Sequence, residues 1–172
     1  PCMALVVSEL MYHEHEDAGD VEFIELYNDR AVTEDIGGYA FTNGIRYTFE
    51  PGTMIGAKQY LVIAKDPAAV EAAYGITGVL GDYSGKLDNG GEKIQISMPG
   101  DVDTQGRRQW IRVDRVNYSD GSHPDDTLGD VDPWPTEPDG AGYSLSRISQ
   151  TEYGNDPVNW KAALLSPGLF NP

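Results

Sequence analysis

Hydrophobic residues along the chain gather in short runs that turn-forming residues separate. Leu5–Leu10 is a short, mainly apolar run, and Tyr60–Ala64 is a continuous apolar run of the kind found in a buried central strand. Between them, Val21–Asn28 carries apolar side chains on both faces of an extended chain, so we expect both faces to be partly covered. Each of these runs predicts a strand.

Two further patterns predict strands in the middle of the chain. Tyr39–Phe41 and Ile45–Phe49 flank Asn43-Gly44, a pair typical of a two-residue hairpin turn because both turn positions need positive φ. Lys93–Met98 alternates apolar and polar side chains, as expected of a strand that buries one face.

The C-terminal half of the chain adds three predicted strands. In Trp110–Tyr118 the apolar positions change parity, and one extra residue near Asp114 and Arg115, a β-bulge, would bring them back to one face. Tyr143–Ile148 is a clear strand, and Val158–Trp160 is a shorter candidate.

One segment alone has the pattern of a helix. Pro67–Tyr74 starts with Pro in a first turn, continues with good helix formers, and is followed by Gly75 as a stop signal. About eight or nine short strands and one short connecting helix predict an all-β fold, an antiparallel β-sandwich.

Length and composition fit this fold class. The 172 residues are enough for one domain, and 20 Gly and 11 Pro suit many short strands joined by loops. No apolar run approaches the about 18 residues that span a bilayer, and no segment resembles a signal peptide. Because the chain opens at Pro1 and not at an initiator Met, we expect residues 1–172 to be a single domain excised from a larger multidomain protein.

The charge balance limits the classes of partner. The chain has 28 Asp and Glu against 12 Lys and Arg, a formal net charge of −16. Such a surface repels phosphate, so nucleic acid and anionic membranes are disfavoured, whereas cations and basic protein surfaces suit it better. Cys2 is the one cysteine, which rules out an internal disulfide and fits either a reducing compartment or a disulfide-free secreted domain.

Eight phrases of the sequence, taken in order, resemble those of bacterial lamin tail domains, relatives of the immunoglobulin-like domain that closes nuclear lamins. Each phrase alone is a common strand-turn string, but the ordered set is specific and covers nearly the whole chain. The phrases are LVVSELMY from Leu5, EFIELYN from Glu22, GGYAFTNGIRYTFEPGT from Gly37, YLVIAKDPAAVEAAYG from Tyr60, GKLDNGGEKIQI from Gly85, DPWP from Asp132, YSLSRI from Tyr143 and NDPVNW from Asn155.

The resemblance implies an immunoglobulin-like β-sandwich without a catalytic site, used as an interaction or structural module of a larger bacterial protein. It also implies a secreted or cell-surface location and a protein or cell-surface partner, and it leaves the oligomeric state open. Three loops depart from the family pattern: His13–Asp20, Asp101–Gln109 and Ser122–Val131. Since loops on a rigid sandwich carry specificity, no particular partner is carried over from the family.

The acidic stretch from Asp120 to Asp139 contains the leading candidates for metal ligands. Seven acidic residues occur there without any Lys or Arg, and flexible loops rich in oxygen donors suit Ca²⁺. We take Asp120, Asp130 and Asp132 as the candidate ligands of a Ca²⁺ ion that the fold would not require. The alternative is a solvated acidic loop.

Two other segments are weaker candidates. Asp101 and Asp103 open a D-x-D-x-Q-G pattern like the front half of a calcium loop, but Arg112 stands where that loop needs its bidentate Glu. The alternative there is a Gly-containing hairpin loop. His13 and His15 lie two residues apart and could supply two ligands to zinc or another divalent ion, or they could belong to a solvated polar loop.

Enzyme motifs fail on inspection, so we expect no catalytic activity. Ser146 stands where a nucleophile elbow around Ser144 needs its second Gly. Leu87 stands where a phosphate-binding loop at Gly85-Lys86 needs Ser or Thr.

The tryptophans support a rival function. Trp134, between two prolines, could stack on a sugar or a proline-rich peptide, or it could plug one end of the core. Trp160 is expected to be buried, and Trp110 has no assigned role. In the rival interpretation the chain is a carbohydrate- or substrate-targeting domain attached to an enzyme, with Trp134 in its binding site.

Overall fold

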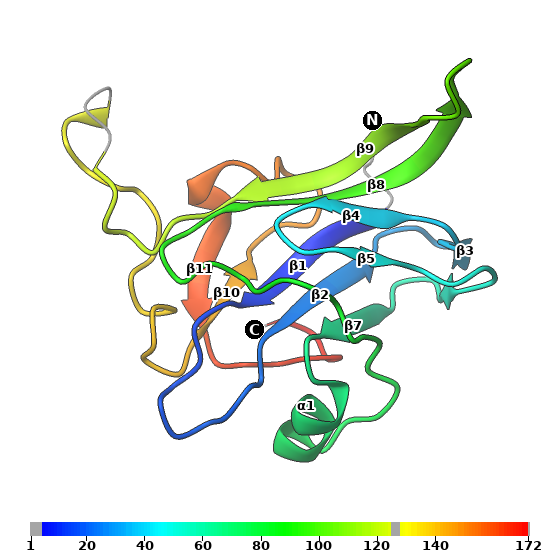
Figure 1. The fold of residues 1–172 in the computed structure, drawn as a ribbon. Helices are drawn as coiled ribbons and strands as arrows, with labels where there is room; N and C mark the ends of the chain where they lie inside the picture. The colour runs from blue at the N-terminus through cyan, green and yellow to red at the C-terminus, as the bar shows by residue number, and fades with distance from the viewer. Residues whose placement is uncertain (1–4, 125–127, 172) are drawn as a thin grey trace.

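The computed structural model describes residues 5–124 and 128–171, so Cys2 and the acidic residues Asp125 and Asp126 lie outside the described residues. In the described residues the chain forms eleven strands and one α-helix (Figure 1). The strands are β1 (Leu5–Met11), β2 (Phe23–Asn28), β3 (Glu34–Asp35), β4 (Ala40–Asn43), β5 (Tyr47–Thr48), β6 (Met54–Ile55), β7 (Tyr60–Ala64), β8 (Lys93–Val102), β9 (Arg108–Asn117), β10 (Ser144–Arg147) and β11 (Trp160–Ala163). The helix α1 spans Pro67–Tyr74, and a 3₁₀ turn, Pro157–Asn159, precedes β11. The predicted all-β class with one short helix is confirmed.

The strands form two antiparallel layers. The first sheet has the order β11-β10-β1-β2-β7, and the second has the order β5-β4-β8-β9. The short strands β3 and β6 pair with each other at one side. Two facing antiparallel sheets of this kind make the immunoglobulin-like β-sandwich that the sequence resemblance implies.

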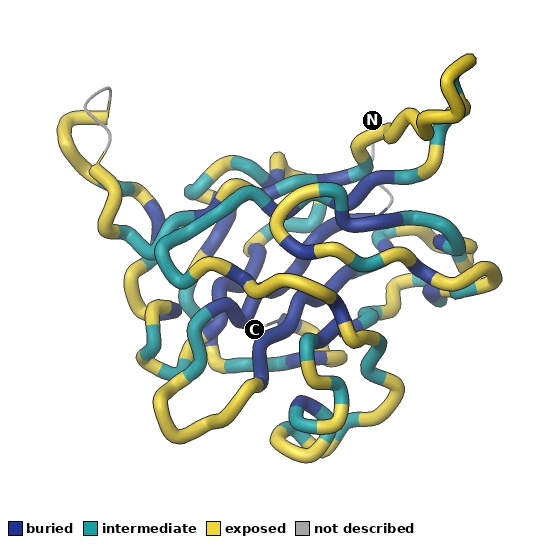
Figure 2. Tube along the Cα trace, in the orientation of Figure 1, coloured by how far each residue is buried: buried dark blue, intermediate teal, exposed yellow. Residues whose placement is uncertain are grey.

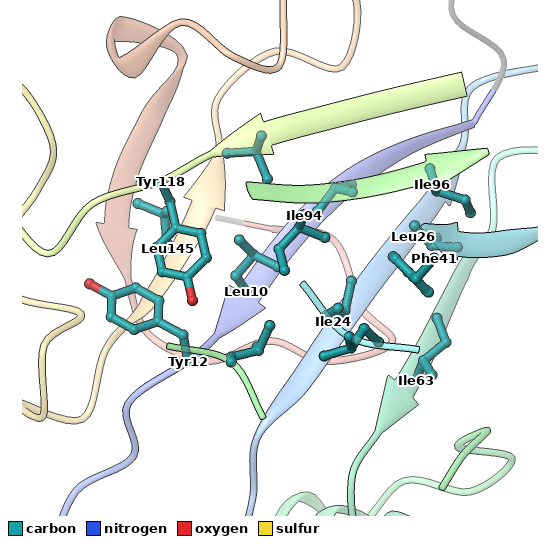
Figure 3. Packing of buried hydrophobic residues seen from close by; sticks show 14 of the residues in the cluster. Leu10, Tyr12, Ile24, Leu26, Phe41, Ile63, Ile94, Ile96, Tyr118 and Leu145 are labelled. Atoms are coloured by element: carbon teal, nitrogen blue, oxygen red, sulfur yellow. The ribbon is translucent and has the colours of Figure 1, made fainter. Parts of the chain in front are cut away.

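The main core lies between the two sheets (Figures 2 and 3). Figure 3 shows Leu10, Ile24 and Leu145 of the first sheet facing Ile94 and Ile96 of the second. The alternation predicted for the strand from Lys93 therefore places Ile94 and Ile96 in the core, and both are fully buried.

A second, smaller core covers the opposite face of the first sheet. Phe23 and Val62 project there and pack with Val70 of α1. The prediction that β2 is covered on both faces is confirmed. The helix has the predicted bounds, because its ends carry local signals: the Asp66 side chain accepts a hydrogen bond from the Ala69 backbone N–H at 3.0 Å, and Gly75 closes it with φ 67°. No helix in the described part of the chain is long and apolar enough to cross a membrane.

Two local predictions about strand pairing have different outcomes. The bulge predicted near Asp114 is confirmed, because Ile96 pairs with Asp114 and Ser97 with Arg112, which leaves Val113 as the extra residue. The hairpin of β4 and β5 is also present, but the predicted two-residue turn is wrong: Phe41 pairs with Tyr47, so five residues, 42–46, separate the last paired positions of the two strands. The loop is longer because Ile45 turns inward and is buried in the core.

A buried ion pair connects the two layers. Arg147 of β10 donates a hydrogen bond from Nη1 to Asp114 Oδ2 of β9 at 2.6 Å, and both side chains are almost fully buried. The backbone N–H of Val7, beside a bulge in β1, donates to the same carboxylate at 2.9 Å. The pair thus joins strands from both sheets at one position.

Candidate functional site

The N-terminal half of β9 is a continuous run of exposed residues. β9 is the edge strand of the second sheet, and with β8 it forms a long ribbon whose tip projects beyond the body of the molecule (Figure 1). All residues from Arg108 to Arg112 are exposed, as the colour of the ribbon tip in Figure 2 shows. Two of them are large and apolar, Trp110 at 42% and Ile111 at 48% exposure. An edge strand with free backbone N–H and C=O groups is a template for pairing with another chain.

The same ribbon concentrates positive charge in a strongly acidic chain. Four of the 12 basic residues, Arg107, Arg108, Arg112 and Arg115, fall within nine positions. Arg107 pairs with Asp103 at 2.8 Å, and Arg108 donates to the backbone oxygen of Gly100 at 2.8 Å. Arg112 makes no ion pair with any residue that the structure describes. The ribbon therefore offers apolar contact area and uncompensated guanidinium groups side by side.

A second candidate site follows the other end of β9. In the described residues, one group of three His, Cys, Asp or Glu side chains has ligand atoms within 4.8 Å of one another, and it consists of Asp120, His123 and Asp132. His123 Nδ1 lies 3.2 Å from Asp120 Oδ1, and the His123 backbone N–H donates to Asp132 Oδ2 at 3.0 Å. Partial burial acts to raise the pKa of Asp120, but hydrogen bonds from Ser122 and the nearby His123 outweigh it, so the pKa lies below its usual value.

Tight packing fixes this group in place. The backbone N–H of Trp134 donates to Asp132 Oδ1 at 3.1 Å, and Trp134 itself is buried against Trp160. Gly121 lies so close to the segment 134–136 that a Cβ atom there would be 2.4 Å from Thr136 Cγ2. The backbone of the segment 134–136 therefore contacts the loop that carries the three side chains near both of its ends, at Gly121 and at Asp132.

The structure brings together only part of the predicted metal ligands. Asp120 and Asp132 meet, but the exposed Asp130, with φ 60°, lies outside the group. The positive φ places Asp130 in a turn, and Asp is one of the few residues that adopt it readily. His123 takes part instead of Asp130.

The other predicted ligands lie elsewhere. Asp103 Oδ1 accepts hydrogen bonds from the backbone N–H groups of Gln105 and Arg107, both at 2.9 Å, so this carboxylate organises the β8–β9 turn. The hydrogen bonds from Arg107 lower the pKa of Asp103. Asp101 is exposed at the end of β8 and belongs to no cluster of three ligands among the described residues.

The two histidines of the first loop are also separated. His13 Nδ1 contacts Asp139 at 2.5 Å, whereas His15 Nδ1 lies 3.7 Å from the exposed Asp17. The pair therefore has different partners and does not converge on one point.

The group around His123 also contains a serine, but its geometry differs from that of a catalytic triad. Ser119 Oγ lies 3.2 Å from His123 Nδ1, and Asp120 Oδ1 lies at the same distance from the same nitrogen. In a catalytic triad the serine hydroxyl bonds to the histidine Nε2, which takes its proton. The carboxylate bonds to Nδ1–H on the other side of the ring and holds the imidazole in the correct orientation. This arrangement suits ligation better than proton transfer.

Two glutamates form a third polar site that the sequence did not predict. Glu9 of β1 and Glu25 of β2 pair directly across the strands, and both are fully buried. The backbone N–H of Ser166 donates to Glu9 Oε1 at 3.1 Å, and that of Gly168 donates to Glu25 Oε2 at 2.7 Å. The segment after β11 is thus held over the first sheet by these two carboxylates.

The residues that sequence reasoning missed fall into two kinds. The run of arginines from Arg107 to Arg115 was visible in the charge pattern, because the rest of the chain is acidic. His123 was not, since only the tertiary fold brings it near Asp132.

Among known protein families, the Lamin Tail Domain matches the chain over residues 2–120. No curated protein matched the chain. Strands β10 and β11 lie beyond the matched residues, yet β10 pairs with β1 and both strands belong to the first sheet. The match covers most of the sandwich and five of the eight phrases that suggested this family, while the phrases from Asp132, Tyr143 and Asn155 lie beyond it. The chain therefore belongs to the lamin tail domain family.

Proposed function

We propose that this chain is an interaction module of a secreted or cell-surface bacterial protein, and that it binds an acidic, extended peptide segment along the edge of β9 that pairs with no strand in the described residues. Membership of the lamin tail domain family makes it an immunoglobulin-like, non-catalytic module. The observation that carries the finer proposal is the exposed edge from Arg108 to Arg112 with Trp110 and Ile111 at its centre.

The edge supplies the groups that strand addition needs. An added strand gains backbone hydrogen bonds from the edge, and its alternate side chains contact those of the edge strand. Trp110 pairs with Pro99 and Ile111 with Met98, so successive side chains point to opposite faces and both faces of an added strand would find apolar contacts. Trp and Arg are also the residues most often found at the energetic centres of protein interfaces.

Charge decides the kind of partner. Arg108 and Arg112 lie on either side of Trp110, and an added strand with carboxylates at matching positions would face them. Two copies of this edge would instead bring arginines close to one another, which disfavours edge-to-edge pairing of the chain with itself. A carboxylate-bearing strand of another protein is the occupant that fits.

A titration with synthetic peptides tests this proposal. The ligand is a ten-residue peptide of alternating Glu and Val, and its control is the same peptide with Lys in place of Glu. We expect amide shifts in the NMR spectrum to centre on Arg108–Val113, with tighter binding of the Glu peptide that weakens as salt rises. Equal binding of both peptides, or shifts centred elsewhere, would overturn the proposal.

Variants separate the contributions of charge and apolar contact. Arg112→Glu should weaken binding of the Glu peptide several-fold, while Arg46→Glu, a matched change at another exposed arginine, should leave it unchanged. Trp110→Ala should cost more than about tenfold, the usual effect at a central aromatic contact. Self-association of the unliganded chain in sedimentation, lost in Arg112→Glu, would show that the occupant is a second copy and would contradict the proposal.

Targeting of an appended enzyme to carbohydrate is the second candidate function. The buried Trp134, with 8% exposure, lacks the open aromatic face that sugar stacking needs, but Trp110 has one. The two functions differ in their dependence on charge. A neutral hexasaccharide that binds the wild type and Arg112→Glu equally, and fails with Trp110→Ala, would favour the targeting function.

The proposed location rests on the family resemblance and has a direct test. An epitope placed on the domain within its parent protein should be cleaved by protease added to intact cells of the source bacterium. Protection of the epitope until the cells are lysed would contradict a surface location, and the neighbouring domains of the parent gene would show whether an enzyme is attached.

A further inference from the structure

The three side chains that meet beyond the end of β9 have the chemistry of a metal site. Asp120, His123 and Asp132 supply two carboxylates and one imidazole with ligand atoms within 4.8 Å. Ligands held about 2.0–2.2 Å from one tetrahedral zinc ion lie about 3.4 Å apart. The 3.2 Å between His123 Nδ1 and Asp120 Oδ1 is close to that separation.

A buried hydroxyl beside these carboxylates supplies a second, independent observation. Tyr12 is fully buried, and its hydroxyl has no hydrogen-bond partner among the described residues. Its ring packs on Tyr118 at a centroid distance of 4.6 Å, and Figure 3 shows its hydroxyl pointing out of the core toward the loops that follow β9. Burial raises the pKa of Tyr12, and Asp139, Asp120 and Asp132 raise it further, so the hydroxyl stays protonated as a donor.

A buried hydrogen-bond donor without a partner lowers the stability of the folded state, and buried polar groups in native proteins rarely lack a partner. A ligand-bound water or a shifted carboxylate oxygen at the site would give the Tyr12 hydroxyl an acceptor. Two of the three ligands, His123 and Asp132, line a pocket of about 320 Å³, which leaves room on their side of the site for an ion with its remaining water ligands. The site thus has three ligands, an outer donor and open space.

We propose that Asp120, His123 and Asp132 bind a zinc-like divalent ion, with Tyr12 as a hydrogen-bond donor to the ligands or to a water on the ion. The imidazole decides the class of ion: nitrogen suits zinc and related transition metals, whereas Ca²⁺ and Mg²⁺ take oxygen. The bound ion would tie the turn after β9 to the segment before Trp134. This proposal does not depend on peptide binding at β9.

Thermal unfolding of the chelator-treated protein with one added cation at a time, at matched ionic strength, tests the site. With zinc at about a hundred times its Kd, we expect the midpoint to rise by about 5–10 °C for a chain of this size. Calcium, magnesium and sodium should each give a smaller rise. Equal rises in all four salts would mean screening of the acidic surface, and a larger rise with calcium would exclude the zinc class; either result overturns the proposal.

Matched variants locate the effect. His123→Ala and Asp132→Asn should abolish the rise with zinc, whereas Asp130→Asn, in the same loop, and His13→Asn, beside Asp139, should keep it. Because His123 is exposed, its variant should unfold at the wild-type midpoint without metal. A zinc effect that persists in His123→Ala, or a wild type that zinc does not stabilise, would overturn the assignment.

Tyr12→Phe tests the role of the buried hydroxyl. Without metal the variant should be at least as stable as the wild type, because it removes an unpaired donor. Its zinc affinity, measured by calorimetry, should fall by about tenfold, the usual loss when an outer hydrogen bond to a metal ligand is removed. Unchanged affinity would show that Tyr12 takes no part in the site.

Discussion

Replacement of Glu25 by Gln should change how the stability of this domain depends on pH. Glu25 lies fully buried opposite Glu9, where the Ser8 hydroxyl donates to it at 2.7 Å and the Gly168 backbone N–H at 2.7 Å. Burial raises the pKa of Glu25 from 4.5 to about 8, and the charge of Glu9 contributes to the rise. Gln keeps the shape and stays neutral at every pH.

The direction of this pH dependence follows from the difference between the pKa of Glu25 in the folded state and its pKa in the unfolded state. A carboxyl group whose pKa is raised on folding contributes stability that is fully present below its unfolded pKa and is lost as pH rises through the folded pKa. With values of 4.5 unfolded and about 8 folded, and about 1.4 kcal/mol per pKa unit, Glu25 should cost the wild type about 4 kcal/mol between pH 5 and pH 9. Glu25→Gln has no titratable group at this position and therefore does not lose this stability.

Urea unfolding at pH 5, 7 and 9 measures the effect. Relative to the wild type, Glu25→Gln should gain about 4 kcal/mol of unfolding free energy from pH 5 to pH 9. Glu16→Gln, a change at an exposed position, should follow the wild-type curve. If the curves of wild type and Glu25→Gln stay parallel across this range, the buried carboxyl pair does not titrate as described and the reasoning fails.

Three other predictions concern the rest of the molecule. Arg147→Met should cost about 3–5 kcal/mol in thermal or urea unfolding because it leaves Asp114 buried without its partner, and adding Asp114→Leu should recover much of that loss. A fragment of residues 1–120 should show no cooperative unfolding in calorimetry, since it lacks β10, the neighbour of β1; a cooperative transition would contradict an undivided sandwich. The isolated domain should stay at background on ester, glycoside, phosphate and peptide substrates, and turnover lost on changing Ser144 or His123 would contradict this.

Local signals allowed parts of the fold to be predicted with correct bounds. The helix was found because Pro67 and Gly75 mark its ends in the sequence itself. The bulge near Asp114 was found because apolar positions that change parity within one strand can share a face only if the strand holds an extra residue. The two-residue strands β3 and β6 were not distinguished, since so few residues carry no periodicity and their pairing depends on the whole sheet.

Longer-range features could not be predicted in the same way. Asp120 and Asp132, two of the three candidate ligands taken from the acidic stretch, lie close together, but nothing in the spacing shows that Asp130 adopts φ 60° and lies outside the group. The pairing of Glu9 with Glu25 depends on a bulge in β1 that shifts the register between Val7 and Glu9. Both features follow from the tertiary fold, which a single sequence does not reveal.

The most direct test of the proposed function is the contact between the alternating Glu–Val peptide and β9 in the complex. Isotope-filtered NMR should give backbone contacts between the peptide and Arg108–Arg112, in the pattern of a strand added to β9. The outward-pointing amides of that segment should also become protected from hydrogen exchange when the peptide binds. Peptide contacts confined to other surfaces, with β9 amides exchanging as fast as in the free domain, would contradict the proposal that this edge is the binding surface.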